Sequence, residues 1–134
     1  LLSAGYNSMI TGYMPDYTCL ITPIFRIYEY LLHRILGDRC KLETSTNKGT
    51  SNFAFFKKTE TYHYEFNNEQ AKQYLSCDQL NFLENLYNTY NEVRHPHSHW
   101  QKDSLDAKTV DSISDAREYL QSGLKMANEY YKLF

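Results

Sequence analysis

The sequence predicts a mainly α-helical protein, a bundle of three long helices with one or two short ones and a small insertion. Two observations predict this fold class. Apolar residues recur at helical spacing in three long stretches of the chain. Glycine (5) and proline (3) are too scarce for a turn-rich β-sandwich or β-barrel. At 134 residues the chain, residues 1–134, has the length of a single domain.

The first long helix is predicted between residues 17 and 36. Residues 1–13 are mildly apolar and fit a short helix or a docking arm, and Asp16 is a candidate N-cap. The apolar residues that follow occupy an arc of roughly 140° on a helical wheel, the stripe of a helix that faces a core. They are Leu20, Ile21, Ile24, Ile27, Tyr28, Leu31, Leu32 and Ile35. We expect Gly37 and Asp38 to end this helix.

The next stretch predicts a loop followed by a β-hairpin. Residues 38–52 are polar and rich in Gly, Ser and Thr, which is typical of a surface loop. Aromatic and charged residues alternate in part over residues 53–66. This pattern predicts two short strands, about 53–57 and 61–66, which form the small insertion in the bundle.

The remaining helices are predicted in two regions. Asn67 or Asn68 is expected to cap a helical region that kinks or restarts near residues 76–78 and stops at Pro96. From Thr109 onward, apolar residues at helical spacing predict a final helix of about five or six turns.

The composition excludes several classes of protein. Lys and Arg (14) against Asp and Glu (16) give a net charge of −2, which excludes a nucleic-acid coat protein that binds through global positive charge. The three cysteines are widely spaced without a CxxC pair, so neither a zinc knuckle nor a disulfide framework is indicated, and a cytoplasmic location is favoured. No apolar run suits a membrane span or a signal peptide, and the missing initiator Met suggests a piece of a longer protein.

The densest cluster of functional groups is RHPHSHW, residues 94–100. One interpretation is a solvated helix end, where Arg and His complement the negative end of the helix dipole. A metal site of His95, His97 and His99 is a second interpretation, although Pro96 interrupts a strand and the spacing is not that of familiar zinc sites. The third interpretation is acid–base chemistry at a phosphate group.

Arg94 and His99 have the side chains that this chemistry needs. An arginine matches phosphate oxygens with a permanent charge, and a histidine exchanges protons near neutral pH. The R-x4-H spacing alone is a weak signal, because Arg26 and His33 form a similar pair on the polar side of the first long helix. We expect that second pair to be solvated, whereas a bend at Pro96 would let Arg94 and His99 converge. Glu29 lies on the same polar side as Arg26, and plain solvation is the simpler interpretation for it.

Taken together, the predicted helices and the Arg94–His99 motif resemble a HEPN domain. The resemblance rests on a helix carrying Glu29, a second helix ending in R-x4-H and a long closing helix. More specifically, PDYTCLITPIFRIYEYLLHRILGD (15–38) and NTYNEVRHPHSHW (88–100) resemble the C-terminal, antitoxin-binding domain of RnlA/LsoA-type bacterial toxins. Residues 39–66 have no counterpart in this resemblance.

The resemblance implies a metal-independent endoribonuclease toxin without a cofactor, a hydrolase of phage defence. In such proteins two domains form a homodimer, and two R-x4-H motifs face one groove that binds RNA. The catalytic residues would then be Arg94, His99 and Glu29. His95 stands where HEPN motifs often have Asn, and His95 and His97 are candidates to support the catalytic pair. A cognate or phage-encoded antitoxin would dock on the same domain and close the groove.

Aromatic residues make up 16% of the chain, and most of them are expected in the core or at protein contacts. Tyr62, Tyr64 and Trp100 are the candidates for contact with a substrate or a partner protein. Two further functions remain open besides the ribonuclease. One is a binding or dimerisation module for an antitoxin that is inactive by itself, and the other is a histidine-rich metal enzyme.

Overall fold

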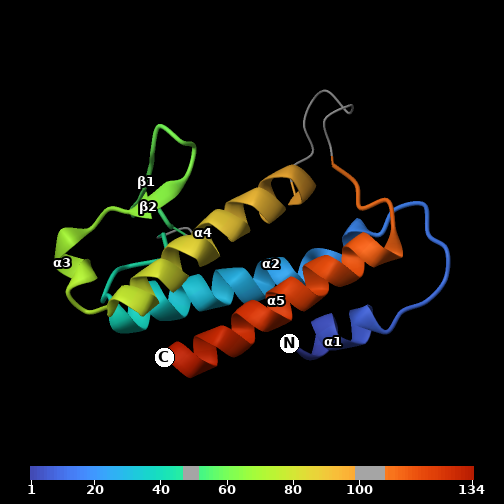
Figure 1. The fold of residues 1–134 in the computed structure, drawn as a ribbon, viewed down its shortest axis with the longest axis horizontal. Helices are drawn as coiled ribbons and strands as arrows, with labels where there is room; N and C mark the ends of the chain where they lie inside the picture. The colour runs from blue at the N-terminus through green and yellow to red at the C-terminus, as the bar shows by residue number, and fades with distance from the viewer. Residues whose placement is uncertain (47–51, 99–107) are drawn as a thin grey trace.

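Three long helices, α2, α4 and α5, form the body of the molecule (Figure 1), and the predicted fold class is confirmed. The computed structural model describes residues 1–46, 52–98 and 108–134, without the side chains of residues 95, 96 and 98. The elements are α1 (Leu2–Ser8), α2 (Thr18–His33), the π-helical turn η1 (Arg34–Arg39), β1 (Phe56–Lys58), β2 (Tyr64–Phe66), α3 (Glu69–Lys72), α4 (Cys77–Ser98) and α5 (Ile113–Leu133).

Helix α2 is the centre of the bundle, because α1, α4 and α5 all pack against it. All eight of its predicted core residues are buried, including Ile21 and Ile24, which are fully inaccessible. Gly123 of α5 lies directly against Ile24 of α2, because an added Cβ at Gly123 would fall 2.9 Å from Ile24 Cγ2. A glycine is therefore needed at this crossing, because any side chain would displace Ile24 from its packed position.

The two ends of α2 differ in how well they follow the prediction. At its start, the N-cap residue is Tyr17 and not the predicted Asp16, although Asp16 Oδ1 accepts a hydrogen bond from the Thr18 backbone N–H at 2.8 Å. At its end, the prediction that Gly37 and Asp38 stop the helix is wrong. The chain continues as η1, where Ile35 and Leu36 are fully buried, and it turns away only at Lys41, whose φ is 59°.

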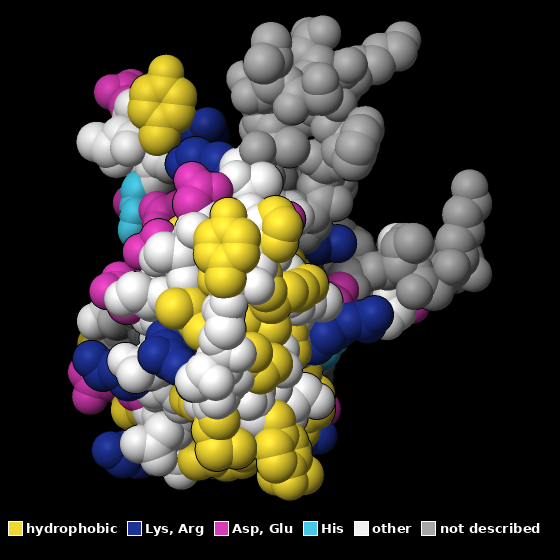
Figure 2. Space-filling view, turned by 90° about the vertical axis from the view of Figure 1, so that its right-hand side faces the viewer, with side chains coloured by type: hydrophobic (Ala, Val, Ile, Leu, Met, Phe, Trp, Pro, Cys, Tyr) yellow, Lys and Arg dark blue, Asp and Glu magenta, His cyan; other side chains and the backbone are white. Residues whose placement is uncertain are grey.

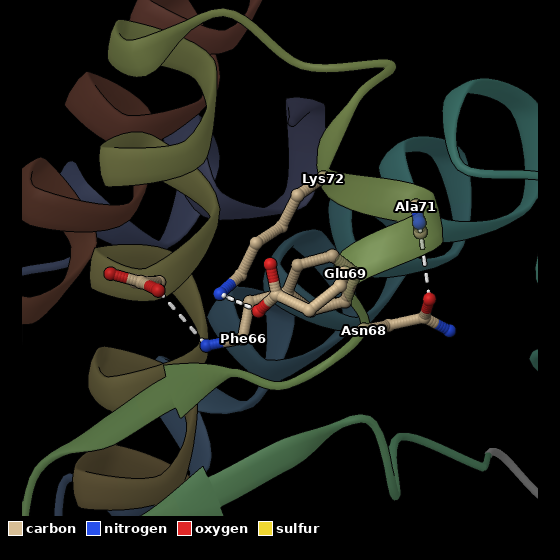
Figure 3. A network of polar contacts seen from close by, with 6 residues as sticks. Phe66, Asn68, Glu69, Ala71 and Lys72 are labelled. Atoms are coloured by element: carbon tan, nitrogen blue, oxygen red, sulfur yellow. Dashed lines mark hydrogen bonds and ion pairs between the residues drawn. The ribbon is translucent and has the colours of Figure 1, made fainter.

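Polar contacts fix the short α3 (Figure 3) and the start of α4. Asn68 is the N-cap of α3 and accepts a hydrogen bond from Ala71 N–H, and Glu69 pairs with Lys72 at 2.6 Å. Ser76 and Gln79 then exchange backbone-to-side-chain hydrogen bonds at the start of α4. This reciprocal arrangement is a capping box, and it accounts for the predicted restart near residues 76–78.

The predicted stop at Pro96 is wrong, because α4 continues through Pro96 to Ser98. A proline removes one backbone donor and crowds the carbonyl four residues earlier, which discourages a helix without forbidding it. Helix α2 also contains an internal proline, Pro23, and remains helical around it. In α2, the buried residues on either side of Pro23 show that packing outweighs the local preference of proline.

The predicted hairpin is present, with strands shorter than expected. The strands β1 and β2 pair antiparallel, with Phe56 opposite Phe66 and Lys58 opposite Tyr64. The hairpin stands against α4 (Figure 1), where the ring of Phe56 stacks on Tyr87 at 3.7 Å between centroids. Phe66 is almost completely buried, so the inner side of the hairpin extends the core rather than forming a separate sheet.

Candidate functional site

The end of α4 holds Arg94 against an aromatic ring. Arg94 is half-buried, and its guanidinium carbon lies 5.3 Å from the centroid of the Tyr90 ring, one helical turn earlier. This separation is within the range of about 6 Å over which a cation is attracted to an aromatic face. Arginine keeps its charge at any ordinary pH, so a permanent positive charge stands at the edge of the core.

The hydroxyl of Tyr90 is the one buried side-chain polar group, in the described part of the chain, that lacks a hydrogen-bond partner. Tyr90 is 4% exposed, and no described group forms a hydrogen bond with its hydroxyl. Burial is the main cause that raises the pKa of Tyr90, the Arg94 cation opposes it, and the charge of Glu29 raises the pKa further. Glu29 and Arg94, predicted from separate helices, therefore both act on this one hydroxyl.

Glu29 is not simply solvated, which is the simpler interpretation of its position in the sequence. It is half-buried rather than solvated, and its negative charge is one of the causes that raise the pKa of Tyr90 on α4. The Arg94 cation lowers the same pKa, and its guanidinium lies over the Tyr90 ring. Glu29 and Arg94 are therefore the two predicted catalytic residues whose charges act on Tyr90.

His33, which the sequence suggests is solvated, is held in place by two contacts. Its Nδ1 lies 2.7 Å from Thr44 Oγ1, and its ring centroid is 4.9 Å from that of Phe53. Phe53 in turn meets Tyr90 edge to face at 5.8 Å. A row of rings therefore connects His33 on α2 to the Tyr90–Arg94 pair on α4.

The predicted supporting residue His97 has its contacts elsewhere. Its Nδ1 lies 2.8 Å from the Lys108 carbonyl oxygen, and its ring meets Tyr119 of α5 edge to face at 5.8 Å. These contacts tie the end of α4 to the segment that leads into α5. The structure therefore places His97 in a packing role and does not bring it to Glu29 or Tyr90.

The other members of the RHPHSHW cluster lie outside the described residues. These are the side chain of His95 and the whole of His99 and Trp100. Within the described ranges, no group of three or more His, Cys, Asp or Glu residues is arranged to hold a metal ion. In the same ranges, no helix is long and apolar enough to cross a membrane.

The two predicted contact tyrosines of the hairpin have different surroundings. Tyr64 is half-buried and meets Tyr87 of α4 edge to face at 5.3 Å. Tyr62 is 78% exposed at the hairpin turn, with a left-handed backbone φ of 62°. The Lys58 ammonium lies 4.5 Å from the Tyr62 ring and 5.9 Å from the Tyr64 ring. Tyr62 therefore remains available for a contact, whereas Tyr64 belongs to the junction of the hairpin with α4.

A second surface feature lies around α1, away from this site. A groove of about 540 Å³ is bordered by residues of α1, α2 and α5, among them Asn7, Arg26 and Tyr131. Exposed apolar side chains lie at its border and elsewhere on and after α1, and Figure 2 shows hydrophobic side chains gathered on one side of the molecule. The largest of them include Leu1, Leu2, Tyr6, Met9, Tyr13 and Tyr30. A patch of this kind is typical of a protein–protein contact.

Comparison with known families gives a direct match. The family described as "RNase LS, bacterial toxin DBD domain" matches residues 1–101. The chain belongs to this RNase LS toxin family. The matched region of the family domain contains Glu29, Arg94 and His99 and ends before α5.

The RNase LS toxin domain also has a clear structural relative. Its fold is similar to that of the Escherichia coli toxin LsoA, in a crystal structure of LsoA in complex with the T4 phage antitoxin Dmd. The TM-score is 0.72 at 16% sequence identity, over 97% of this chain and 50% of the LsoA chain. The chain thus spans half the length of that relative. A comparison with curated proteins gives no match.

Two residues of the candidate site, Tyr90 and His33, are not among the site residues predicted from the sequence. Like most aromatic residues of the chain, Tyr90 is expected in the core or at a protein contact, although its position four residues before Arg94 is the signal of an aromatic ring beside a cation on one helix face. His33 stands four residues after Glu29, which likewise places both on one face of α2. Its contacts with Thr44 and Phe53 come from the returning loop, and no local pattern predicts them.

Proposed function

We propose that this chain is a metal-independent endoribonuclease domain of a bacterial toxin, with Arg94 and His99 as its catalytic residues and Glu29 beside them. Two copies form a homodimer whose groove binds RNA, and an antitoxin inhibits the enzyme by docking over that groove. The single observation that carries this proposal is that Arg94 of the R-x4-H motif lies half-buried against Tyr90 at the end of α4, in a member of an RNase LS toxin family.

The chemistry follows from the substrate itself, because RNA carries its own nucleophile. The ribose 2′-oxygen attacks the adjacent phosphorus, its proton passes to a base, and the bond from phosphorus to the 5′-oxygen breaks. An acid returns a proton to the departing 5′-oxygen, so the products end in a 2′,3′-cyclic phosphate and a 5′-hydroxyl. His99 transfers protons in this reaction, and Arg94 holds the phosphate and stabilises its transition-state charge.

Pairing of two copies would supply both the base and the acid that the two proton transfers need. One arginine and one histidine supply one base or one acid, whereas the reaction needs both within the same groove. A second copy brings a second Arg94 and His99. Glu29, on the neighbouring helix, orients the cation of its own copy. Half-burial of Arg94 strengthens its interaction with a phosphate, since less water screens the charge.

Cleavage of a labelled RNA by the purified chain, with a chelator present, tests this proposal. We expect the wild-type chain to leave 2′,3′-cyclic phosphate ends, and Arg94→Ala or His99→Ala to lower the rate on the order of a hundredfold or more. Arg26→Ala is the matched control, because Arg26 is an exposed arginine of the other Arg/His pair, and it should keep the wild-type rate. A wild-type rate in folded His99→Ala would overturn the assignment.

A second candidate is an antitoxin-binding or dimerisation module that is inactive by itself. It is favoured by the exposed apolar patch around α1, by the net charge of −2, and by the fact that the chain spans half of LsoA. Adding purified Dmd to the chain separates the two functions. Cleavage that Dmd suppresses supports the enzyme, whereas Dmd binding by a chain that leaves RNA intact supports the module.

A further inference from the structure

The pair formed by Tyr90 and Arg94 has a functional consequence. We propose that Tyr90 is a positioning residue, whose ring face fixes the Arg94 guanidinium in the orientation that holds the phosphate. This inference rests on the proposed function. It assigns a functional role to Tyr90, one of the aromatic residues that are expected in the core or at protein contacts.

The first argument is the geometry of the pair on α4. Residues four apart on a helix lie one above the other, so the Arg94 side chain can lie across the ring of Tyr90. The measured separation of 5.3 Å matches such a contact. Because Tyr90 is 4% exposed and Arg94 half-buried, little water competes for the cation, which strengthens the attraction to the ring.

The second argument is that the ring itself cannot move freely. Phe53 meets it edge to face at 5.8 Å, and Tyr87 lies against it at 6.5 Å with an interplanar angle of 35°. Phe53 is in turn in contact with His33 on α2. An arginine is a long and flexible side chain, and a ring fixed on two sides removes part of that freedom before a substrate binds.

The third argument is that the Tyr90 ring, rather than its hydroxyl, is the part that holds Arg94. The hydroxyl is buried without a hydrogen-bond partner among the described residues, whereas the Arg94 guanidinium lies over the ring. The same hydroxyl is exposed to the opposing charges of Glu29 and Arg94. The ring therefore stands at the meeting point of the proposed catalytic groups, not simply in the apolar interior.

The test compares Tyr90→Phe with Tyr90→Leu. The first keeps the ring face and removes the hydroxyl, and the second keeps an apolar side chain without a ring. We expect Tyr90→Phe to keep kcat/KM for RNA within about twofold and Tyr90→Leu to lower it at least about tenfold, mainly in kcat, since misplacing a catalytic group affects the reacting geometry. Equal losses in both variants would overturn the proposal.

Phe82→Leu is the matched control for lost packing. Phe82 lies on the same helix and is also 4% exposed, but its ring neighbours are Tyr130 and Phe134 rather than an arginine. Thermal unfolding of all three variants shows how much packing each one loses. If Phe82→Leu and Tyr90→Leu lower stability and kcat/KM alike, the role of Tyr90 is structural and the proposal fails.

An NMR measurement tests the positioning step without relying on cleavage. The Arg94 Nε–Hε signal, assigned by its loss in Arg94→Ala, should carry a ring-current shift in the wild-type chain and in Tyr90→Phe, and lose it in Tyr90→Leu. Absence of that shift in the wild type overturns the inference and leaves the proposed function standing. If the shift is present but Arg94→Ala cleaves RNA at the wild-type rate, the proposed function is what fails, and this inference falls with it.

Discussion

The side chain of Asn88 on α4 binds both backbone polar groups of Tyr64 on β2. Its Oδ1 accepts a hydrogen bond from the Tyr64 N–H at 2.8 Å, and its Nδ2 donates to the Tyr64 carbonyl at 2.8 Å. One turn earlier on α4, Glu84 accepts a hydrogen bond from the Phe66 N–H at 2.9 Å. Side chains of α4 thus satisfy the outer edge of β2 as a third strand would. This matters because a hairpin of two strands is marginally stable in water by itself.

Replacing Asn88 with Ala should loosen the hairpin from α4. Asn88 is 7% exposed, so its loss leaves the Tyr64 N–H and carbonyl without partners at a buried junction. We expect the free energy of unfolding to fall by about 2–3 kcal/mol and the hairpin amides to exchange faster. Asn91→Ala is the control, because the half-buried Asn91 donates a hydrogen bond to the Tyr87 carbonyl on its own helix rather than to β2. Equal losses in the two variants would contradict the importance of this junction.

Gly123→Ala should destabilise the crossing of α2 and α5. The added methyl group would meet both the Cγ2 and Cγ1 atoms of Ile24, at 2.9 and 3.3 Å, and Ile24 has no empty space to enter because it is fully buried. The expected loss is about 1–3 kcal/mol, measured by chemical denaturation. Gly5→Ala on α1 has no atom within 4 Å of the new methyl, and it should be neutral or stabilising by up to about 1 kcal/mol. A Gly123→Ala variant as stable as the wild type would show that the crossing tolerates a wider separation.

Cys40 should resist alkylation while the other two cysteines react. Burial raises the pKa of the Cys40 thiol from 9.0 to about 11, whereas Cys19 and Cys77 are exposed. Iodoacetamide near neutral pH should therefore modify two sites in the folded chain and three in the unfolded chain, counted by mass spectrometry. Because the unfolded thiol loses its proton first, the contribution of Cys40 to stability is full below pH 9.0 and declines as the pH rises toward about 11. Modification of Cys40 at the same rate as Cys77 would contradict its burial.

The body of the bundle could be predicted because its signals are local. The apolar stripe of α2 and the caps at Asn68 and Ser76 lie within a few residues of the features that they set. The true ends of the two helices could not be predicted in the same way, because both helices continue past the local stop signals at Gly37 and Pro96. Burial of Ile35 and Leu36 extends the first helix past Gly37, so tertiary packing decides against the local preference.

The candidate site could be predicted only in part, for a related reason. Arg94 is visible in the sequence as a residue type suited to phosphate chemistry, whereas Glu29 is selected only through the family resemblance; both lie within the matched residues 1–101. That both act on Tyr90 depends on how α2 crosses α4, which involves residues 61 positions apart in the chain. The contacts of His33 depend on the loop that returns through Thr44 and Phe53. Such long-range contacts produce no periodic pattern in a single sequence, so they cannot be predicted from it.

Glu29→Gln separates the placement of Glu29 from its proposed role. The variant keeps the size of the side chain and removes the charge that raises the pKa of Tyr90, so that pKa should fall, as followed by NMR of the labelled tyrosine ring. On the proposed function, RNA cleavage should also fall on the order of tenfold to a hundredfold, because the carboxylate no longer orients Arg94. Glu92→Gln, an exposed glutamate on α4, should change neither quantity. A lowered Tyr90 pKa with unchanged cleavage would keep Glu29 near Tyr90 and remove it from the mechanism.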